Sequence, residues 1–203
     1  LYKNDPAWVP TLKMDLLGSR LLGIKGLLFS DHPFHRHAEV RYFAALNDSN
    51  QMMGTIAAVI NHAHNEYHQE KTGFFGFFEC IEDEAVAKAL LSAAQNWLKT
   101  KGMDRMRGPA SFSTNDPVGL LIDAYEEIPY MFTPYNKPYY RAFLENYGFT
   151  KAMDLLAEMM PVKDEDAETL GRIERLKRFS DKIKTRFQIT LEDFDIKNPD
   201  RHL

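Results

Sequence analysis

The chain contains one cysteine, and this scarcity excludes several kinds of site. Cys80 cannot form a disulfide within the chain, and by itself it cannot supply a thiolate cluster for a metal ion. A single free cysteine among 203 residues is typical of a reducing compartment, so we expect a cytoplasmic protein.

Long apolar runs and an excess of positive charge are also missing. No stretch approaches the roughly 18 residues that a membrane-spanning helix needs, and the first residues, LYKNDPAWVP, lack the apolar core of a secretion signal. The 25 Lys and Arg residues stand against 29 Asp and Glu residues, which gives a formal net charge of −4. Such a chain has no overall attraction to nucleic acid or to anionic lipid. We therefore expect neither a nucleic acid nor a membrane as a partner.

The remaining composition is that of a folded globular chain, with 44% hydrophobic and 27% charged residues. The chain begins without Met and ends at NPDRHL, so we expect it to be part of a longer protein.

Alternating and continuous apolar patterns predict the secondary structure. Residues 37–61 have the pattern of a β-hairpin around the turn NDSNQ, and residues 72–81 form a third strand in which Gly73 and Gly76 indicate a bulge or a close backbone approach. The segment 82–102 has an apolar stripe at helical spacing, an acidic start and a basic end, and these features predict a helix.

The second half of the sequence predicts further elements around one long loop. We expect a strand within 103–113, the loop 114–138, a short helix ending at Gly148, and a strand over 149–162. An amphipathic helix over 164–186 and a strand over 187–196 follow.

Two side-chain clusters have simpler interpretations than ligand binding. His62 and His64 would share a strand face with His68 in the following loop, but their spacing matches no fixed zinc signature, so we predict no metal site. The four phenylalanines within 74–78 are typical of a central strand that is buried on both faces.

The order of these elements, ending in PYYRAFLENYGF, resembles the GNAT N-acetyltransferase superfamily over roughly residues 36–162. The segments HNEYHQEKTGFFGFFEC and RGPASFSTND are also similar to a bacterial GNAT-like group that carries two such domains in tandem. The resemblance implies an α/β, GNAT-like mixed sheet with helices on both faces. It implies a GNAT-like domain over 1–162, with 163–203 as a connecting helix and the first strand of a second domain. That second domain, or a second copy of the chain, is the partner that we expect.

The resemblance implies an N-acyltransferase that moves an acetyl or other acyl group from acyl-CoA to an amine acceptor. GNAT enzymes bind the pyrophosphate of acetyl-CoA at a helix start with the pattern Q/R-x-x-G-x-G/A. Here Glu82 stands at the Gln/Arg position, Ala85 at the first glycine and Ala87 at the last small position. The implied cofactor-binding residues are Ile81, Glu82, Ala85, Val86, Ala87 and Lys88.

The helix start departs from the family pattern in its charge. The acidic run EDE at 82–84 would repel a bound anion, and Ala85 adds a methyl group where bare backbone is needed. Two interpretations stay open: a purely structural helix start, and a degenerate turn that still binds CoA. A GNAT-like domain that has lost catalysis and acts as a binding or scaffold domain is the alternative function.

Candidate catalytic residues follow from the same resemblance. The family's general acid, often Tyr, stands four positions before the Gly-Phe pair, where this chain has Leu144. Tyr140 lies one turn earlier on the same helix face and is the candidate acid, against a role as a packed aromatic residue. Glu79, at the end of the cofactor strand, is the candidate base, against a plain strand-end acid.

The long loop supplies candidate substrate-binding residues. Asn115 and Asp116 enter this loop, where an Asx-turn is the competing interpretation. Tyr135 and Asn136 lead into the short helix and would line the acceptor pocket, unless they only form a proline-bounded turn with an aromatic anchor.

Overall fold

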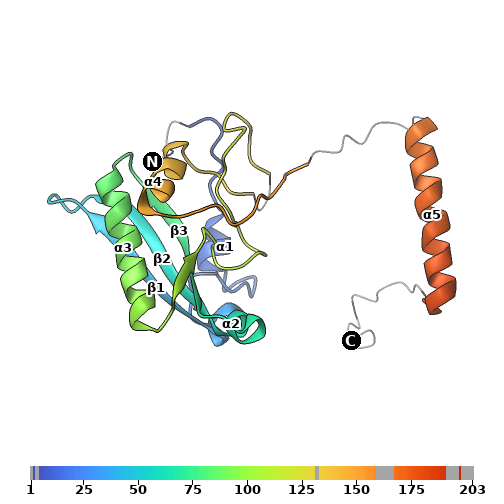
Figure 1. Ribbon diagram of the computed structural model, residues 1–203, viewed down its shortest axis with the longest axis horizontal. Coiled ribbons are helices and arrows are strands. Elements are labelled where there is room, and N and C mark those ends of the chain that lie inside the picture. Colours follow the sequence, from blue (N-terminus) through green and yellow to red (C-terminus); the bar gives the residue numbers. More distant parts are fainter. Residues whose placement is uncertain (1, 3–4, 131–132, 159–166, 191–196, 198–203) are drawn as a thin grey trace. The chain divides into compact units, whose positions relative to one another are not determined.

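The structure is a computed structural model that describes residues 2, 5–130, 133–158, 167–190 and 197 (Figure 1). The chain divides into two compact units, residues 1–155 and residues 156–203. The first unit holds the sheet. The second holds helix α5 (Ala167–Phe187), close to the helix expected over 164–186.

The sheet of the first unit has the order β1-β2-β3-β4. Strands β1 (Ala38–Leu46), β2 (Met52–Asn61) and β3 (Thr72–Cys80) are antiparallel neighbours, and β4 (Arg105–Arg107) runs parallel to β3. The predicted hairpin forms because the Asn47 side chain accepts hydrogen bonds from the backbone N–H groups of Ser49 and Gln51, at 3.0 and 2.9 Å, and so closes the turn. The predicted α/β class with a mixed sheet is confirmed.

Strand β3 contains the irregularity that its glycines predict. Its pairing with β2 shifts between Thr55 and Ala57, and Phe77 adopts a positive φ of 47°. A Cβ atom at Gly76 would lie 1.9 Å from the carbonyl oxygen of Ala110, so only glycine fits there. The extra residue makes a β-bulge, which changes the direction of the last residues of β3.

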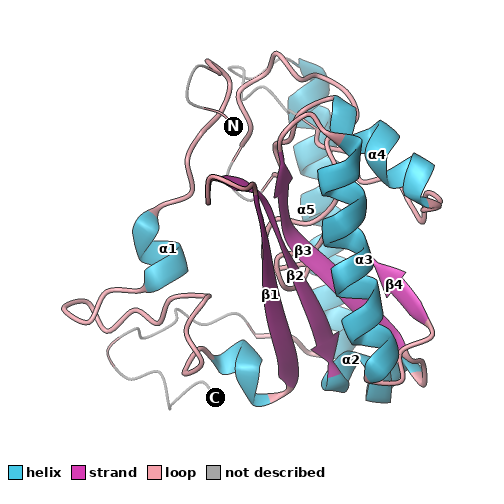
Figure 2. Ribbon diagram, turned by 90° about the vertical axis from the view of Figure 1, so that its left-hand side faces the viewer, coloured by secondary structure: helices cyan, strands magenta, loops and turns pink. Residues whose placement is uncertain are grey.

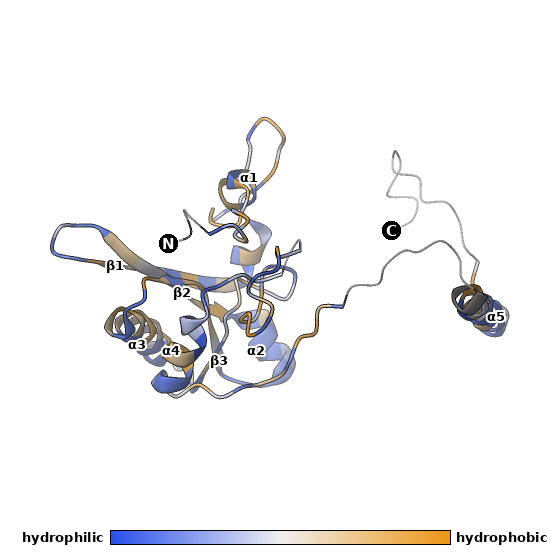
Figure 3. Cartoon of the chain, turned by 90° about the horizontal axis from the view of Figure 1, so that it is seen from above, coloured by the Kyte–Doolittle hydropathy of each residue, from blue (hydrophilic) through white to orange (hydrophobic). Residues whose placement is uncertain are grey.

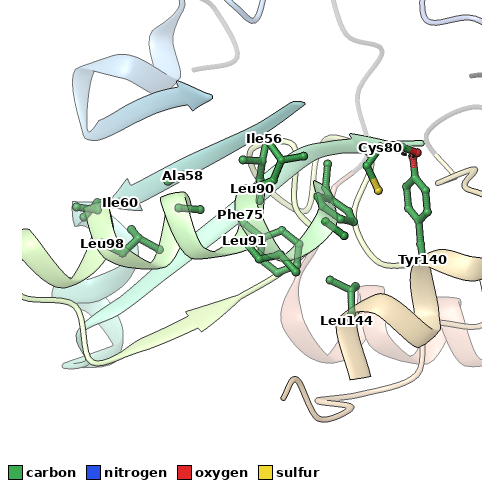
Figure 4. Packing of buried hydrophobic residues seen from close by; sticks show 13 residues of the cluster. Ile56, Ala58, Ile60, Phe75, Cys80, Leu90, Leu91, Leu98, Tyr140 and Leu144 are labelled. Carbon is green, nitrogen blue, oxygen red and sulfur yellow. Dashed lines mark hydrogen bonds between the residues drawn. The ribbon is translucent and has the colours of Figure 1, made fainter. Parts of the chain in front are cut away.

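One face of the sheet packs against α3 (Glu84–Thr100) and α4 (Tyr139–Tyr147). The apolar stripe of α3 inserts Leu90, Leu91 and Leu98 between strand residues such as Ile56 and Phe75, as Figure 4 shows. Burial of these side chains is the main stabilising contribution to this face. The N-terminal half of α4 packs at the end of β3, which brings its tyrosines to Cys80.

The opposite face has a thinner cover. A short 3₁₀ helix, η1 (Pro33–Arg36), and the segment around Phe112 pack here against Ala57 and Val59, with the rings of Phe34 and Phe112 stacked 4.7 Å apart. Figure 2 shows α3 and α4 on one side of the sheet and α1 (Lys13–Leu17) on the other. Within the first unit, helices thus lie on both sides of the sheet, and the two longer ones, α3 and α4, lie on the same side.

Two predicted elements differ from the structure. Residues His62–His68 form helix α2 rather than a strand and loop, because the Asn61 side chain accepts a hydrogen bond from the N–H of His64 and caps a helix start. Strand β4, by contrast, agrees with the prediction: it ends at Arg107, before Gly108 and Pro109, because proline cannot donate to a strand ladder. Residues 149–158, expected to begin a strand, have no strand partner.

Part of the expected C-terminal structure lies outside the described residues. Residues 159–162 of one expected strand and 191–196 of the other are not described, and 188–190 form no strand. The second GNAT-like domain therefore stays a prediction.

Candidate functional site

A carboxylate and two phenols meet at the end of β3. The hydroxyl groups of Tyr2 and Tyr140 donate hydrogen bonds to the same oxygen of Glu79, Oε2, at 2.6 and 2.7 Å. Both tyrosines are buried, and Glu79 is half-buried. The two residues that the sequence analysis named as candidate base and acid are therefore in direct contact.

The tyrosines at the start of α4 also hold the backbone of the next residue. The N–H of Cys80 donates to the Tyr140 hydroxyl oxygen at 2.9 Å, and the Tyr139 hydroxyl donates to the Cys80 carbonyl at 3.0 Å. In Figure 4 the Tyr140 hydroxyl reaches the Cys80 end of the apolar cluster. Strand β4 pairs with β3 only at Thr72–Phe74 and does not extend to Cys80. The two tyrosine hydroxyls therefore bond the N–H and the carbonyl of Cys80, which a neighbouring strand would otherwise bond.

Burial determines the protonation of this cluster. It raises the pKa of the Glu79 carboxyl, although the two donated hydrogen bonds act in the opposite direction. Burial, followed by the nearby charge of Glu79, also raises the pKa of the Tyr140 hydroxyl, which therefore stays neutral. Glu79 is thus a better proton acceptor than an exposed carboxylate, and Tyr140 is a neutral donor.

Helix α3 begins at Glu84, four residues after Cys80, and its N-terminal amides already have a partner. Asp83 is the N-cap, and its carboxylate accepts hydrogen bonds from the N–H groups of Ala85 and Val86, at 2.8 and 3.4 Å. The N–H of Ala87 is bonded to the Asp83 carbonyl. A pyrophosphate at this helix start would have to displace the Asp83 carboxylate and lie beside two further acids, Glu82 and Glu84.

The other predicted cofactor residues do not all face this turn. Ala87 is buried in the apolar cluster, and the N–H of Ile81 is bonded to the carbonyl of Met53. Lys88 is exposed and is the one basic side chain in the expected set.

A pocket of about 510 Å³ lies between the N-terminal segment and the long loop. We call it the N-terminal pocket; its lining includes Asp5, Tyr125, Glu126, Ile128, Tyr135 and Lys137. The Tyr135 hydroxyl donates to Asp5 at 2.7 Å, and Lys137 forms an ion pair with the same carboxylate. These hydrogen bonds, first that from Lys137, lower the pKa of Asp5.

The pocket is next to the Glu79 cluster. The rings of Tyr135 and Tyr2 have centroids 5.9 Å apart, and the Lys137 ammonium lies 5.4 Å from the centroid of the Tyr2 ring. Tyr2 therefore lies between two residues that line the pocket, Tyr135 and Lys137, and the Glu79 carboxylate, although it does not line the pocket itself.

The remaining predicted substrate residues have local partners. Asp116 accepts hydrogen bonds from the N–H and the hydroxyl of Ser113, at 3.2 and 2.8 Å, and the N–H of Asn115 donates to the same hydroxyl at 3.2 Å. The buried Asn136 side chain accepts from the N–H of Leu121 at 2.7 Å and donates to its carbonyl at 3.2 Å. Of the four predicted residues, only Tyr135 lines the pocket.

Two of the histidines form pairs with acids. His62 lies 3.1 Å from Glu39, and His64 lies 2.6 Å from Glu70. Within the described ranges, no group of three or more His, Cys, Asp or Glu side chains is arranged to hold a metal ion.

Sequence reasoning missed the residues that come from the N-terminal segment. Tyr2 and Asp5 belong to a stretch with no regular structure, and they reach partners 77 and 132 residues away along the chain. No local pattern marks such contacts. The only signal in the sequence is the residue types: an aromatic residue, Tyr2, and an acid, Asp5, stand close to Pro6.

The chain is similar in sequence to two curated bacterial proteins. No protein-family model matches the chain. It is 32% identical over 189 residues to Protein YghO of Escherichia coli (strain K12), a match that covers 93% of this chain and 45% of that protein. It is 30% identical over 158 residues to the Bacterial ceramide synthase of Caulobacter vibrioides (strain NA1000 / CB15N), covering 77% and 39%. The chain thus spans less than half the length of these curated relatives.

Among solved structures, the chain is similar to the "Putative acetyl transferase from Pyrococcus furiosus". The TM-score is 0.37 with 15% sequence identity, and the match covers 60% of this chain and 66% of the other.

Proposed function

We propose that this chain contributes the reaction site of an N-acyltransferase, which moves an acyl group from an acyl thioester to an amine. The hydrogen bond between Tyr140 and Glu79, at 2.7 Å and beside a pocket, carries the proposal. The similarity to a bacterial ceramide synthase supports it, because a ceramide is the amide of a fatty acyl group and a long-chain amino alcohol.

In the proposed reaction a neutral amine attacks the carbonyl carbon of the thioester, and a C–N bond forms. Glu79 takes the surplus proton of the attacking nitrogen as the general base. The C–S bond then breaks and gives the amide and a thiolate. The proton moves from Glu79 through the Tyr140 hydroxyl to the thiolate, so the products are an amide and a free thiol.

The raised pKa of Tyr140 favours this relay over simple proton donation. A phenol whose pKa lies above its ordinary value of about 10 is a poor acid toward a thiolate whose conjugate thiol has a pKa of about 8.5. If Tyr140 receives a proton from Glu79 as it gives one up, it never becomes a buried anion. The short contact between the two side chains permits this transfer.

The N-terminal pocket is the proposed acceptor site. Glu126 would attract a cationic amine, whereas the Asp5 carboxylate is already paired with Lys137; Ile128 and the tyrosine rings provide apolar contacts. The Tyr2 hydroxyl now bonds the oxygen of Glu79 that the amine must reach. We propose that the amine replaces this hydroxyl, which requires Tyr2 to move aside.

The start of α3 stays the proposed contact for acyl-CoA, with Lys88 as its basic residue. As the turn stands, it does not fit a pyrophosphate, because Asp83 occupies two of its amides. No step of the proposed reaction depends on this contact.

Amide formation tests the proposal directly. The chain is incubated with acetyl-CoA or palmitoyl-CoA and the amino alcohol sphinganine, and the amide is measured by mass spectrometry. General-base catalysis contributes about 10² to 10⁴-fold, so Glu79→Gln should lower the rate by at least about 100-fold. Tyr139→Phe is the matched control, because Tyr139 bonds the backbone beside Glu79 but not the carboxylate. An equal rate for Glu79→Gln and the unchanged chain would contradict the proposal.

A non-catalytic binding or scaffold domain is the second candidate function. The Asp83 cap favours it, because it satisfies the amides that a donor phosphate would use. This function predicts no amide from any donor and no stabilisation by acetyl-CoA. A ligand at about 100 times its dissociation constant adds about 2.7 kcal/mol to the unfolding free energy, so a thermal unfolding experiment separates the two candidates.

A further inference from the structure

Exposed apolar side chains gather in the segment between the N-terminal pocket and η1. They include Val9, Leu12, Leu17, Leu21, Leu22 and Phe29. In Figure 3 the segment around α1 lies away from the sheet on the side opposite α3, and apolar colour continues through the loop that follows α1. Soluble chains expose single apolar residues commonly, but a contiguous group indicates a binding surface.

The most exposed residues lie at the tip of a tight turn. Ser19 and Ile24 pair across its base, with N–H to carbonyl distances of 2.9 and 3.0 Å in the two directions. Between them Leu21 is 94% exposed and Leu22 is 62% exposed. We call residues 19–24 the leucine turn.

The backbone holds this turn in place. The N–H groups of Leu27 and Leu28 donate to the carbonyls of Asp15 and Leu16, at 2.9 and 3.0 Å. A Cβ atom at Gly26 would lie 2.2 Å from the backbone N of Gly18, so the two chain segments touch below the turn. Leu27 in turn packs against the apolar cluster of η1. The leucines are therefore presented on a fixed support.

Basic residues surround the leucine turn. Residues 12–29 contain Lys13, Arg20 and Lys25 against the single acid Asp15, whereas the whole chain has a net charge of −4. All three basic side chains are exposed. Arg20 directly precedes the two leucines, and Lys25 follows Ile24.

We propose that the leucine turn inserts into the headgroup region of an anionic lipid bilayer. A convex tip cannot bury both leucines against the flat surface of another protein, but the interface of a bilayer closes around it. The three cations would then lie at the level of the lipid phosphates, where each basic residue contributes favourably. The proposal does not depend on the proposed enzymatic function.

The sequence predicts no membrane partner because its overall charge is negative and no apolar run is long enough to span a bilayer. No helix in the described part of the chain is long and apolar enough to cross a bilayer. An interfacial contact requires neither that length nor a positive overall charge, because only charges within about a Debye length of the surface matter.

Vesicle co-sedimentation tests the proposal. The chain is mixed with vesicles of phosphatidylcholine and phosphatidylglycerol in equal parts, and with vesicles of phosphatidylcholine alone. We expect binding to the mixed vesicles, at least tenfold weaker binding for Leu21→Ser with Leu22→Ser, and weaker binding for Arg20→Glu with Lys25→Glu. Added salt should weaken the binding of the unchanged chain.

Leu46→Ser with Met52→Ser is the matched control, because these residues are 53% and 65% exposed at the end of another hairpin. The control should bind as the unchanged chain does. Undiminished binding by the double-leucine variant would assign the contact to another surface and overturn the proposal. A chain that ignores vesicles but forms a dimer that this variant abolishes would overturn it in favour of a second copy.

Discussion

Replacement of Tyr140 by phenylalanine removes one oxygen that connects α4 to two groups of β3. The hydroxyl donates to Glu79 at 2.7 Å and accepts the N–H of Cys80 at 2.9 Å. A hydrogen bond to a charged group contributes about 1.5–3 kcal/mol, and a buried N–H without a partner costs about 1–3 kcal/mol. Glu79 keeps its hydrogen bond from Tyr2, so the loss of unfolding free energy is smaller than the sum of these two contributions. We expect Tyr140→Phe to lower the unfolding free energy by about 2–4 kcal/mol.

The adjacent residue provides a matched control. Tyr139→Phe removes a single hydrogen bond, from its hydroxyl to the carbonyl of Cys80 at 3.0 Å, and the ring of Tyr139 is only half-buried. This neutral bond contributes about 0.5–1.5 kcal/mol. Urea unfolding of both variants, with unchanged dependence on denaturant, gives the two differences. If Tyr140→Phe costs no more than Tyr139→Phe, the hydroxyl does not make the contacts on which the site depends.

Three further perturbations address the rest of the site. Asp83→Asn keeps a good N-cap but removes its charge, so we expect stability within about 0.5 kcal/mol and tighter binding of acetyl-CoA by calorimetry; unchanged affinity would place the donor elsewhere. Burial raises the pKa of Glu79, so the folded state holds this proton more tightly than the unfolded chain. The stability of the unchanged chain relative to Glu79→Gln should therefore be greatest below about pH 4.3 and should fall as the pH rises through the raised pKa. A relative stability that rises with pH would show that folding lowers the pKa of Glu79 instead. Gly76→Ala should cost about 3 kcal/mol, because its Cβ atom would meet the Ala110 carbonyl. Gly171→Ala in α5 has free space and should stabilise the helix by about 0.5–1 kcal/mol, so equal effects in urea unfolding would contradict the close approach.

The sequence predicts the elements whose signals are local. The hairpin predicted over 37–61 and the helix predicted over 82–102 appear in the structure with outer bounds that differ by at most two residues. The position of Glu79 at the end of β3 follows from the same pattern. The apolar positions of a strand or helix determine which face it buries, so they also determine where its last residue lies.

The sequence does not predict what depends on distant partners. A strand beginning at 149 has apolar residues in its favour, but a strand also needs a neighbour, and residues 151–158 are exposed without one. The pattern of residues 62–68 predicts a strand and a loop, whereas the Asn61 side chain caps a helix there, and this capping contact leaves no periodic signal. Tyr2 reaches Glu79 through a segment with no periodic pattern, so its place in the site could come only from coordinates.

The rate of amide formation by the unchanged chain, divided by that of Glu79→Gln and measured across pH, tests the central claim most directly. If Glu79 is the general base, the ratio should be at least about 100 when the carboxyl is ionised. It should fall toward one as the carboxyl becomes protonated, with a midpoint above the ordinary value of about 4.3, because burial raises this pKa. A ratio that stays near one at every pH would contradict the account.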